Sequence, residues 1–108
     1  MDFNELSRQA VEVRSKYAKL EIKKYGRFWN GQELFQGFVG DVGDLGKIIM
    51  AKEGMRNIEG ADQKLSHELA DCLWSIMVLA DKYQVNLEDS FLKNIEELKN
   101  RIDAEIID

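Results

Sequence analysis

Apolar residues recur at alternating steps of four and three along most of the chain. In the first such segment they are Leu6, Ala10, Val13, Tyr17 and Leu20. An α-helix has 3.6 residues per turn, so this spacing places the apolar side chains on one helix face. The segment therefore predicts an amphipathic helix, and the glycine at position 26 suits the left-handed conformation that often ends one.

Three further segments carry the same spacing, and each is bounded by residues that typically begin or end helices. The second predicted helix runs from about Gly31 to Glu53, the third follows Asp62 as its N-cap, and the fourth follows Asn86. Their apolar positions are Leu34, Phe38, Val42, Leu45 and Ile49, then Leu65, Leu69, Cys72, Ile76 and Leu79, then Phe91, Ile95, Leu98 and Ile102. Long helices with short connections predict a single all-α domain over residues 1–108, folded as an antiparallel four-helix bundle.

Composition supports this fold class and limits the function. The 108 residues suffice for one domain, and the absence of proline favours long helices over many strands. The net charge of −5 argues against a nucleic-acid-binding surface. No apolar run approaches the roughly 20 residues that span a membrane, and the polar start MDFNELSRQA predicts no secretory signal. The single cysteine, Cys72, cannot form an internal disulfide, so we expect a reducing, cytoplasmic compartment.

Two pairs of acidic residues flank the apolar faces of the second and third predicted helices. Asp41 and Asp44 form one pair, and Glu68 and Asp71 form the other. Residues three apart are neighbours on a helix surface, so each pair can direct its carboxylates at one point. If the two pairs converge, their repulsion requires a cation, and hard oxygen ligands favour Mg²⁺ or Mn²⁺. Acids at this spacing are also typical of a solvated helix flank, and by pattern alone that alternative stays open.

Four glycines interrupt the second predicted helix at intervals of three: Gly37, Gly40, Gly43 and Gly46. Each costs a helix interior roughly 0.8–1.0 kcal/mol relative to alanine. Three residues turn a helix by about 300°, so the four glycines cannot line one contact face. Our hypothesis is that Gly37 and Gly40 let a backbone or ligand approach beside the acids. The alternative is a weak helix held by packing.

These segments resemble the MazG-like, all-α nucleoside triphosphate pyrophosphohydrolase superfamily. The stretch GFVGDVGDLGKII is similar to the family's LVEEVGELAKAI, and HELADCLWSI is similar to EELGDVLW. The stretch NIEELKNR resembles the family's ending NxxKLxxR. The resemblance covers nearly the whole chain after Tyr25. It implies one MazG-like helical domain, in which Gly43 matches a glycine that the family often has.

The resemblance also implies an activity. Asp41, Asp44, Glu68 and Asp71 would be the catalytic acids that hold Mg²⁺, or Mn²⁺. A metal-associated water would attack the α-phosphorus of a nucleoside or deoxynucleoside triphosphate, and the products would be the monophosphate and pyrophosphate. Any of the four carboxylates could assist as general base.

Further contacts and an assembly follow from the same resemblance. Lys93, Asn94 and Arg101 would contact phosphate or ribose, although surface placement of the Lys and Arg is an open alternative. The family implies a homodimer or homotetramer in which neighbouring subunits complete the bundle. Trp74 lies outside the main apolar face of the third helix, which also indicates a covering subunit. Trp29, just before the second helix, could stack on a nucleobase or pack in the core.

Departures from the family pattern leave the activity open. Gly40 stands where the family usually has Glu, and the shorter Asp41 and Asp44 replace two further glutamates. Glu97 replaces the Lys of the last motif, which removes a positive charge from a triphosphate site. The chain could therefore have altered substrate or metal preference, weak activity, or none. In the last case it would be a nucleotide-binding protein or a helical interaction module.

Overall fold

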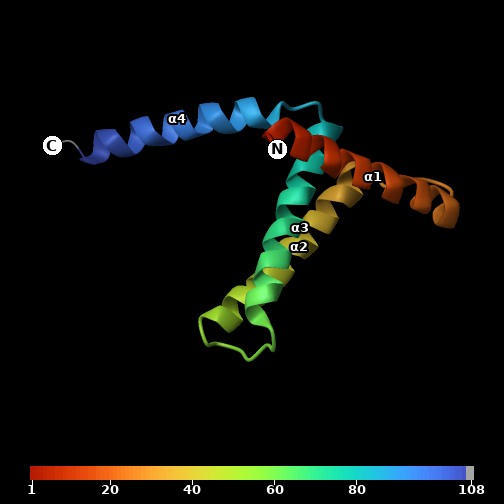
Figure 1. Ribbon diagram of the computed structural model, residues 1–108, viewed down its shortest axis with the longest axis horizontal. Helices are drawn as coiled ribbons and strands as arrows, with labels where there is room; N and C mark the ends of the chain where they lie inside the picture. The colour runs from red at the N-terminus through yellow and green to blue at the C-terminus, as the bar shows by residue number, and fades with distance from the viewer. Residues whose placement is uncertain (107–108) are drawn as a thin grey trace.

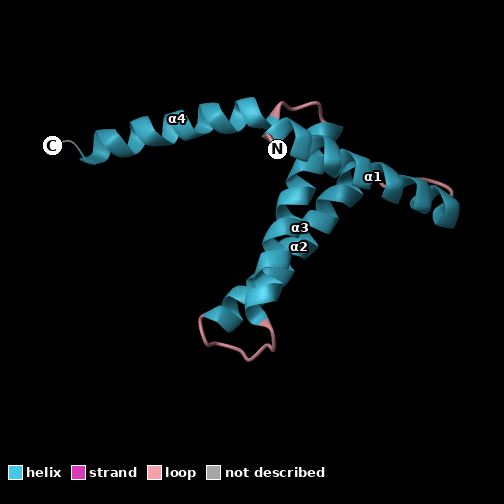
Figure 2. Ribbon diagram, viewed as in Figure 1, coloured by secondary structure: helices cyan, strands magenta, loops and turns pink. Residues whose placement is uncertain are grey.

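The structure is a computed structural model that describes residues 1–106, and it consists of helices joined by short connections. The helices are α1 (Phe3–Tyr25), α2 (Gly31–Lys52), α3 (Ala61–Lys82) and α4 (Leu87–Ile106). No strand occurs within the described residues, as the colouring by secondary structure makes plain (Figure 2). The predicted all-α class and the four predicted helices are confirmed.

Most helix ends follow the sequence signals. Gly26 adopts φ 78° and its N–H donates to the Ile22 carbonyl at 2.9 Å, which confirms the predicted end of α1. The backbone N–H of Asp89 donates to Oδ1 of Asn86 at 3.1 Å, which confirms the predicted cap of α4. At α2, Asn30 and Glu33 form a reciprocal capping box that the sequence analysis did not identify.

The predicted N-cap of α3 is wrong. Gly60, with φ 70°, precedes the helix, and Asp62 lies in its first turn. A carboxylate there is still favourable, because the first turn carries the positive end of the helix dipole. Asp62 instead pairs with Lys52 at the end of α2, so it joins the two ends of the α2–α3 connection.

Helices α2 and α3 lie side by side and antiparallel, while α1 crosses one end of that pair (Figure 1). Helix α4 extends away from the other three and contains no buried residue. The radius of gyration is 17.4 Å, against about 13 Å for a compact domain of this size. One chain therefore does not close its own bundle.

The core of one chain is correspondingly small. Its buried hydrophobic residues are Ala10, Ile48, Cys72, Met77 and Val78. Residues that the periodicity assigned to apolar faces, such as Val42, Leu69 and Ile102, remain 47%, 51% and 55% exposed. No helix among the described residues is both long and apolar enough to cross a membrane.

Trp74, which lies outside the main apolar face of α3, is covered by another helix of the same chain. Trp74 donates from Nε1 to the Ala10 carbonyl at 3.1 Å, and its ring lies 6.0 Å from that of Tyr17. Helix α1 of the same chain thus covers α3 around Trp74. Trp74 therefore does not by itself indicate a covering subunit, because α1, which crosses α3 within the same chain, supplies that cover.

The glycines of α2 differ in what surrounds them. A Cβ on Gly37 would lie 3.7 Å from Cζ3 of Trp29, an ordinary contact, whereas a Cβ on Gly40, Gly43 or Gly46 would meet no atom within 4 Å. Close approach beside the acids is therefore not supported at Gly40, and at Gly37 it amounts to an ordinary contact with the Trp29 ring. The glycine of α2 that a neighbour does approach closely is Gly31, where a Cβ would overlap the Tyr83 hydroxyl.

Candidate active site

One turn of α3 gathers three potential metal ligands. One ligand atom each from His67, Glu68 and Asp71 lies within 4.8 Å of the others. His67 Nε2 lies 3.1 Å from Asp71 Oδ2, a contact between residues four apart on the helix. The convergence of Glu68 and Asp71 follows from their spacing of three, as the sequence analysis expected. His67 was not among the predicted ligands, although its position four residues before Asp71 is a usable signal.

Asp41 faces α3 from the neighbouring helix. The Ser75 hydroxyl donates to Asp41 Oδ2 at 2.8 Å, and Ser75 lies one turn beyond Asp71 on α3. Ser75 is buried and Asp41 is half-buried. Sequence reasoning missed Ser75, whose only signal is its place one turn after Asp71 on the same helix flank. Asp44 is exposed, and neither it nor Asp41 belongs to the His67–Glu68–Asp71 cluster.

The buried thiol of Cys72 lies close enough to Asp41 and to the acids of α3 that all three carboxylates affect its pKa. Burial raises the pKa of Cys72, and the carboxylates of Asp41, Glu68 and Asp71 raise it further. Negative charge from α2 and α3 therefore acts on the same small region. The thiol stays protonated at neutral pH and acts there as a small apolar side chain.

The donor set fits a hard divalent cation. The cluster on α3 offers two carboxylates and one imidazole, and the Asp41 carboxylate lies near enough to act on the same Cys72 thiol. Oxygen-rich sites of this kind suit Mg²⁺ or Mn²⁺. The Ser75 hydroxyl occupies one oxygen of Asp41 and orients the carboxylate, as neighbouring donors commonly do for metal ligands.

A cavity of about 390 Å³ opens beside Asp41, between α1, α2 and α3. Its lining includes Arg14, Tyr17, Trp29, Asp41, Trp74 and Ser75. Small-molecule sites are typically 300–1,000 Å³, with aromatic walls and a few polar groups. The sequence candidate Trp29 therefore lies in the wall of a cavity that borders a candidate metal ligand, where a planar ring could enter.

An ion pair between two residues of α1 lies in the wall of this cavity. Arg14 donates from Nη1 to Glu21 Oε2 at 2.7 Å and from Nη2 to Oε1 at 2.8 Å. The backbone N–H of Trp29 donates to the same Oε1 at 2.8 Å. The Arg14 hydrogen bond lowers the pKa of Glu21 against the effect of burial, and the Trp29 N–H lowers it further. An ionised Glu21 thus joins α1 to the segment before α2.

Sequence reasoning missed this pair. Arg14 and Glu21 are seven residues apart, two helix turns, beside the apolar face that carries Tyr17. Charges at that spacing on a core-facing helix are the signal that could have identified them.

The predicted contacts from α4 do not reach these residues within one chain. Lys93 pairs with Asp89 on its own helix at 3.1 Å, and both are exposed. Asn94, Glu97 and Arg101 are also exposed on α4, which projects away from α2 and α3 (Figure 1).

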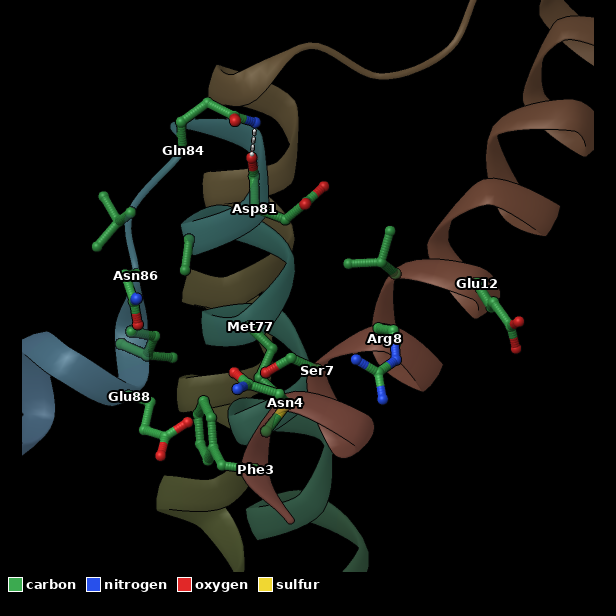
Figure 3. Close-up of a pocket in the computed structure, with 14 residues that line it drawn as sticks. Phe3, Asn4, Ser7, Arg8, Glu12, Met77, Asp81, Gln84, Asn86 and Glu88 are labelled. Atoms are coloured by element: carbon green, nitrogen blue, oxygen red, sulfur yellow. Dashed lines mark hydrogen bonds between the residues drawn. The ribbon is translucent and has the colours of Figure 1, made fainter. Parts of the chain in front are cut away.

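A larger cavity, of about 600 Å³, lies at the other end of α1. The first turns of α1 form one side, and the end of α3 with the connection to α4 forms the other (Figure 3). Its lining includes Phe3, Arg8, Met77 and Gln84, and none of the predicted acids borders it. We therefore place the candidate site at the smaller cavity, where Asp41 and the aromatic walls meet.

Comparison with known families agrees with the sequence pattern. The family model described as the MazG nucleotide pyrophosphohydrolase domain matches residues 47–104, just over half of the chain. The matched range includes Glu68, Asp71 and all of α4 up to residue 104, and it begins after Asp41 and Asp44. No curated protein and no solved structure matches the chain.

Proposed function

Since the chain belongs to the MazG nucleotide pyrophosphohydrolase domain family, we propose that it hydrolyses a nucleoside or deoxynucleoside triphosphate to the monophosphate and pyrophosphate. The observation that carries the proposal is the position of Asp41, which borders the aromatic cavity and is bonded to α3 near its acid cluster. A nucleotide needs a site for its base, which the aromatic cavity would supply, and a site for its phosphates, which the acid cluster would supply. We propose that residues 1–108 act as one domain, in the cytoplasm.

We propose Asp41, Asp44, Glu68 and Asp71 as the catalytic acids and metal ligands. Bound Mg²⁺, or Mn²⁺, would neutralise phosphate charge and lower the pKa of its water. Glu68 and Asp71 present their oxygens together on one turn of α3, and His67 holds Asp71 through its Nε2. Ser75 fixes Asp41 so that its other oxygen stays available.

The same carboxylates would also accept the proton that the attacking water releases. One carboxylate accepts the proton of the attacking water as a new oxygen–phosphorus bond forms at the α-phosphorus. The bond from that phosphorus to the bridging oxygen breaks, and pyrophosphate leaves. Trp29 and the Tyr17–Trp74 pair would hold the base in the adjoining cavity.

We further propose that a homodimer or homotetramer supplies Lys93, Asn94 and Arg101 from the α4 of a neighbouring chain. Helix α4 has no buried residue, and its Phe91 and Ile102 are 58% and 55% exposed. Large exposed apolar faces usually mark interaction surfaces, and α2 and α3 also present such residues. A second chain would cover the exposed apolar residues of α4 and those of α2 and α3, and it would bring Lys93 and Arg101 toward the proposed metal ligands.

A second candidate function is nucleotide binding with weak or absent hydrolysis. The absence of an acid at Gly40 and the presence of Glu97 in place of the family's Lys favour it. In this case the cavity and metal site keep their ligands, and turnover is slow because the phosphates are less well neutralised.

The test is a product assay. The protein is incubated with Mg²⁺ or Mn²⁺ and each common ribo- and deoxyribonucleoside triphosphate, and products are separated by chromatography. Monophosphate with pyrophosphate supports the proposal, whereas diphosphate with phosphate contradicts attack at the α-phosphorus. Glu68→Gln should abolish turnover and retain the helical circular-dichroism signal, while the control Glu59→Gln, in the α2–α3 connection, keeps both. Nucleotide binding without product favours the second candidate.

A further inference from the structure

Arg14 brings a nearly buried cationic donor into a cavity whose lining also contains several aromatic residues. Its side chain is 14% exposed, and that of its partner Glu21 is 10% exposed. Trp29, Tyr17 and Trp74 line the same cavity. A nearly buried guanidinium beside flat apolar walls is suited to contact one polar edge of a planar ligand that lies between them.

The guanidinium has hydrogen-bonding capacity left for such a ligand. It carries five N–H donors and no acceptor. Within residues 1–106 its two hydrogen bonds both go to Glu21, one from each terminal nitrogen. The pair leaves donors free and offsets the positive charge. Arg14 therefore acts toward the cavity as a fixed donor rather than as a free cation, which distinguishes it from a phosphate-binding residue.

Glu21 fixes where this donor points. Both of its oxygens accept from Arg14, and one also accepts from the backbone N–H of Trp29. The Glu21 carboxylate thus fixes the positions of both the Arg14 guanidinium and the Trp29 backbone. A bidentate pair of this kind restricts the geometry more than a single contact would.

We propose that Arg14 determines base specificity, and that it selects nucleobases with a carbonyl at the purine 6-position or the pyrimidine 4-position over those with an amino group there. This inference rests on the proposed function, since it assumes that the cavity receives the base. The preferred class includes uracil, thymine, guanine and hypoxanthine, while cytosine and adenine are disfavoured. A carbonyl accepts from Arg14, whereas an amino group would place donor against donor. Glu21 is a positioning residue.

The test uses nucleoside monophosphates, so that it does not depend on hydrolysis or on metal. The chain's two tryptophans, Trp29 and Trp74, both line the cavity, and a base that enters it should change their fluorescence. Dissociation constants are measured for the pairs IMP and AMP, and dUMP and dCMP. We expect the carbonyl member of at least one pair to bind about 10- to 100-fold more tightly.

The informative variant is the double substitution Arg14→Gln with Glu21→Gln. It removes the fixed donor and leaves no unpaired buried charge, which either single substitution would do. We expect the preference to fall to within about twofold of unity, because a glutamine amide can present either a donor or an acceptor. The control is Arg8→Gln, on the same helix at the other cavity, which should keep the preference.

Several outcomes would overturn the inference. These are equal binding of both members in both pairs, equal weakening of both members in the double variant, and no fluorescence change with any monophosphate. Equal weakening would give Arg14 a purely structural role. Discrimination without any hydrolysis of triphosphates would support the inference and contradict the proposed hydrolase, so the two failures are distinguishable.

Discussion

Ser75 and Asp41 are joined by a hydrogen bond of 2.8 Å that crosses from α3 to α2. Both residues line the aromatic cavity, and Ser75 lies one turn beyond the acidic cluster of α3. The contact therefore lies between the aromatic cavity and the acidic cluster, where we propose that the base and the phosphates bind, and it holds one oxygen of the Asp41 carboxylate.

Removing the Ser75 hydroxyl should weaken metal-dependent activity more than it weakens the fold. In Ser75→Ala the carboxylate of Asp41 loses its orienting donor, and losses of such donors typically cost 10- to 100-fold in metal affinity or activity. The free energy of unfolding should fall by only about 1 kcal/mol. Activity titrated with Mg²⁺, together with thermal unfolding, measures both effects. Ser90→Ala, at an exposed position of α4, serves as the control, and an unchanged Mg²⁺ titration in Ser75→Ala would contradict the role of Asp41.

Acid should selectively remove the stability that the Arg14–Glu21 pair contributes. The pKa of Glu21 is lowered in the folded chain from its ordinary value of 4.5, chiefly by Arg14. A lowered pKa means that this stability is fully present above pH 4.5 and is lost as the pH falls through the folded-state pKa. Thermal unfolding of the native chain and of the Arg14→Gln, Glu21→Gln variant should therefore converge at low pH.

The comparison with the double variant is needed because a second group titrates nearby. Arg27 and a backbone N–H lower the pKa of Glu33 to about 2, so Glu33 also contributes to acid unfolding. Both chains in the comparison retain Glu33, and the difference between them isolates Glu21. A difference in unfolding temperature that stays constant from pH 7 to pH 2 would be the contrary result.

Placing an acid at position 40, where the family usually has Glu, should strengthen Mg²⁺ binding. A Cβ at Gly40 meets no atom within 4 Å, so Gly40→Glu is sterically tolerated. The substitution also removes an interior glycine, which favours the helix by roughly 0.5–1 kcal/mol. We expect half-maximal activity at a lower Mg²⁺ concentration. Gly46→Glu adds the same charge at an equally open position that points elsewhere around α2, and it should leave the Mg²⁺ requirement unchanged. If Gly40→Glu and Gly46→Glu lower the Mg²⁺ requirement equally, the effect comes from the added negative charge and not from its position.

Two inactive chains should restore activity when they assemble together. If the acids come from one chain and Arg101 from its neighbour, a mixed dimer of Glu68→Gln and Arg101→Ala contains one site with both residues intact. Co-expression with two different tags and sequential purification isolates that species for the product assay. Activity in the mixed dimer, with none in either parent, is expected. An inactive mixed dimer beside an inactive Arg101→Ala parent would place Arg101 in the same site as its own chain's acids.

The sequence predicted what depends on neighbouring residues along the chain. Apolar spacing defined the four helices, and Gly26 ended α1 as a left-handed cap. The convergence of Glu68 and Asp71 is likewise a property of one helix turn, and it needs no tertiary information. These features are set by helix geometry, which is the same wherever the helix lies.

What the sequence did not predict depends on how segments return to one another. The link from Glu21 to Trp29 requires the connection after Gly26 to bring a backbone N–H back to α1. The apolar pattern of α4 identified its apolar face but carried no information about its direction, which leaves that face uncovered in one chain. Asp62 is not the N-cap because Gly60, two residues earlier, occupies that position and the helix begins at Ala61.

The small core has a thermodynamic consequence for the isolated chain. Denaturant sensitivity and the heat capacity of unfolding both scale with the surface that unfolding newly exposes. Residues 1–106 bury five hydrophobic residues and leave side chains such as Phe91 and Leu69 more than half exposed, so a single chain has little such surface to expose. A single copy should therefore unfold over a broad range of urea with a small heat-capacity increment. A steep urea transition would measure the apolar surface that a neighbouring molecule covers.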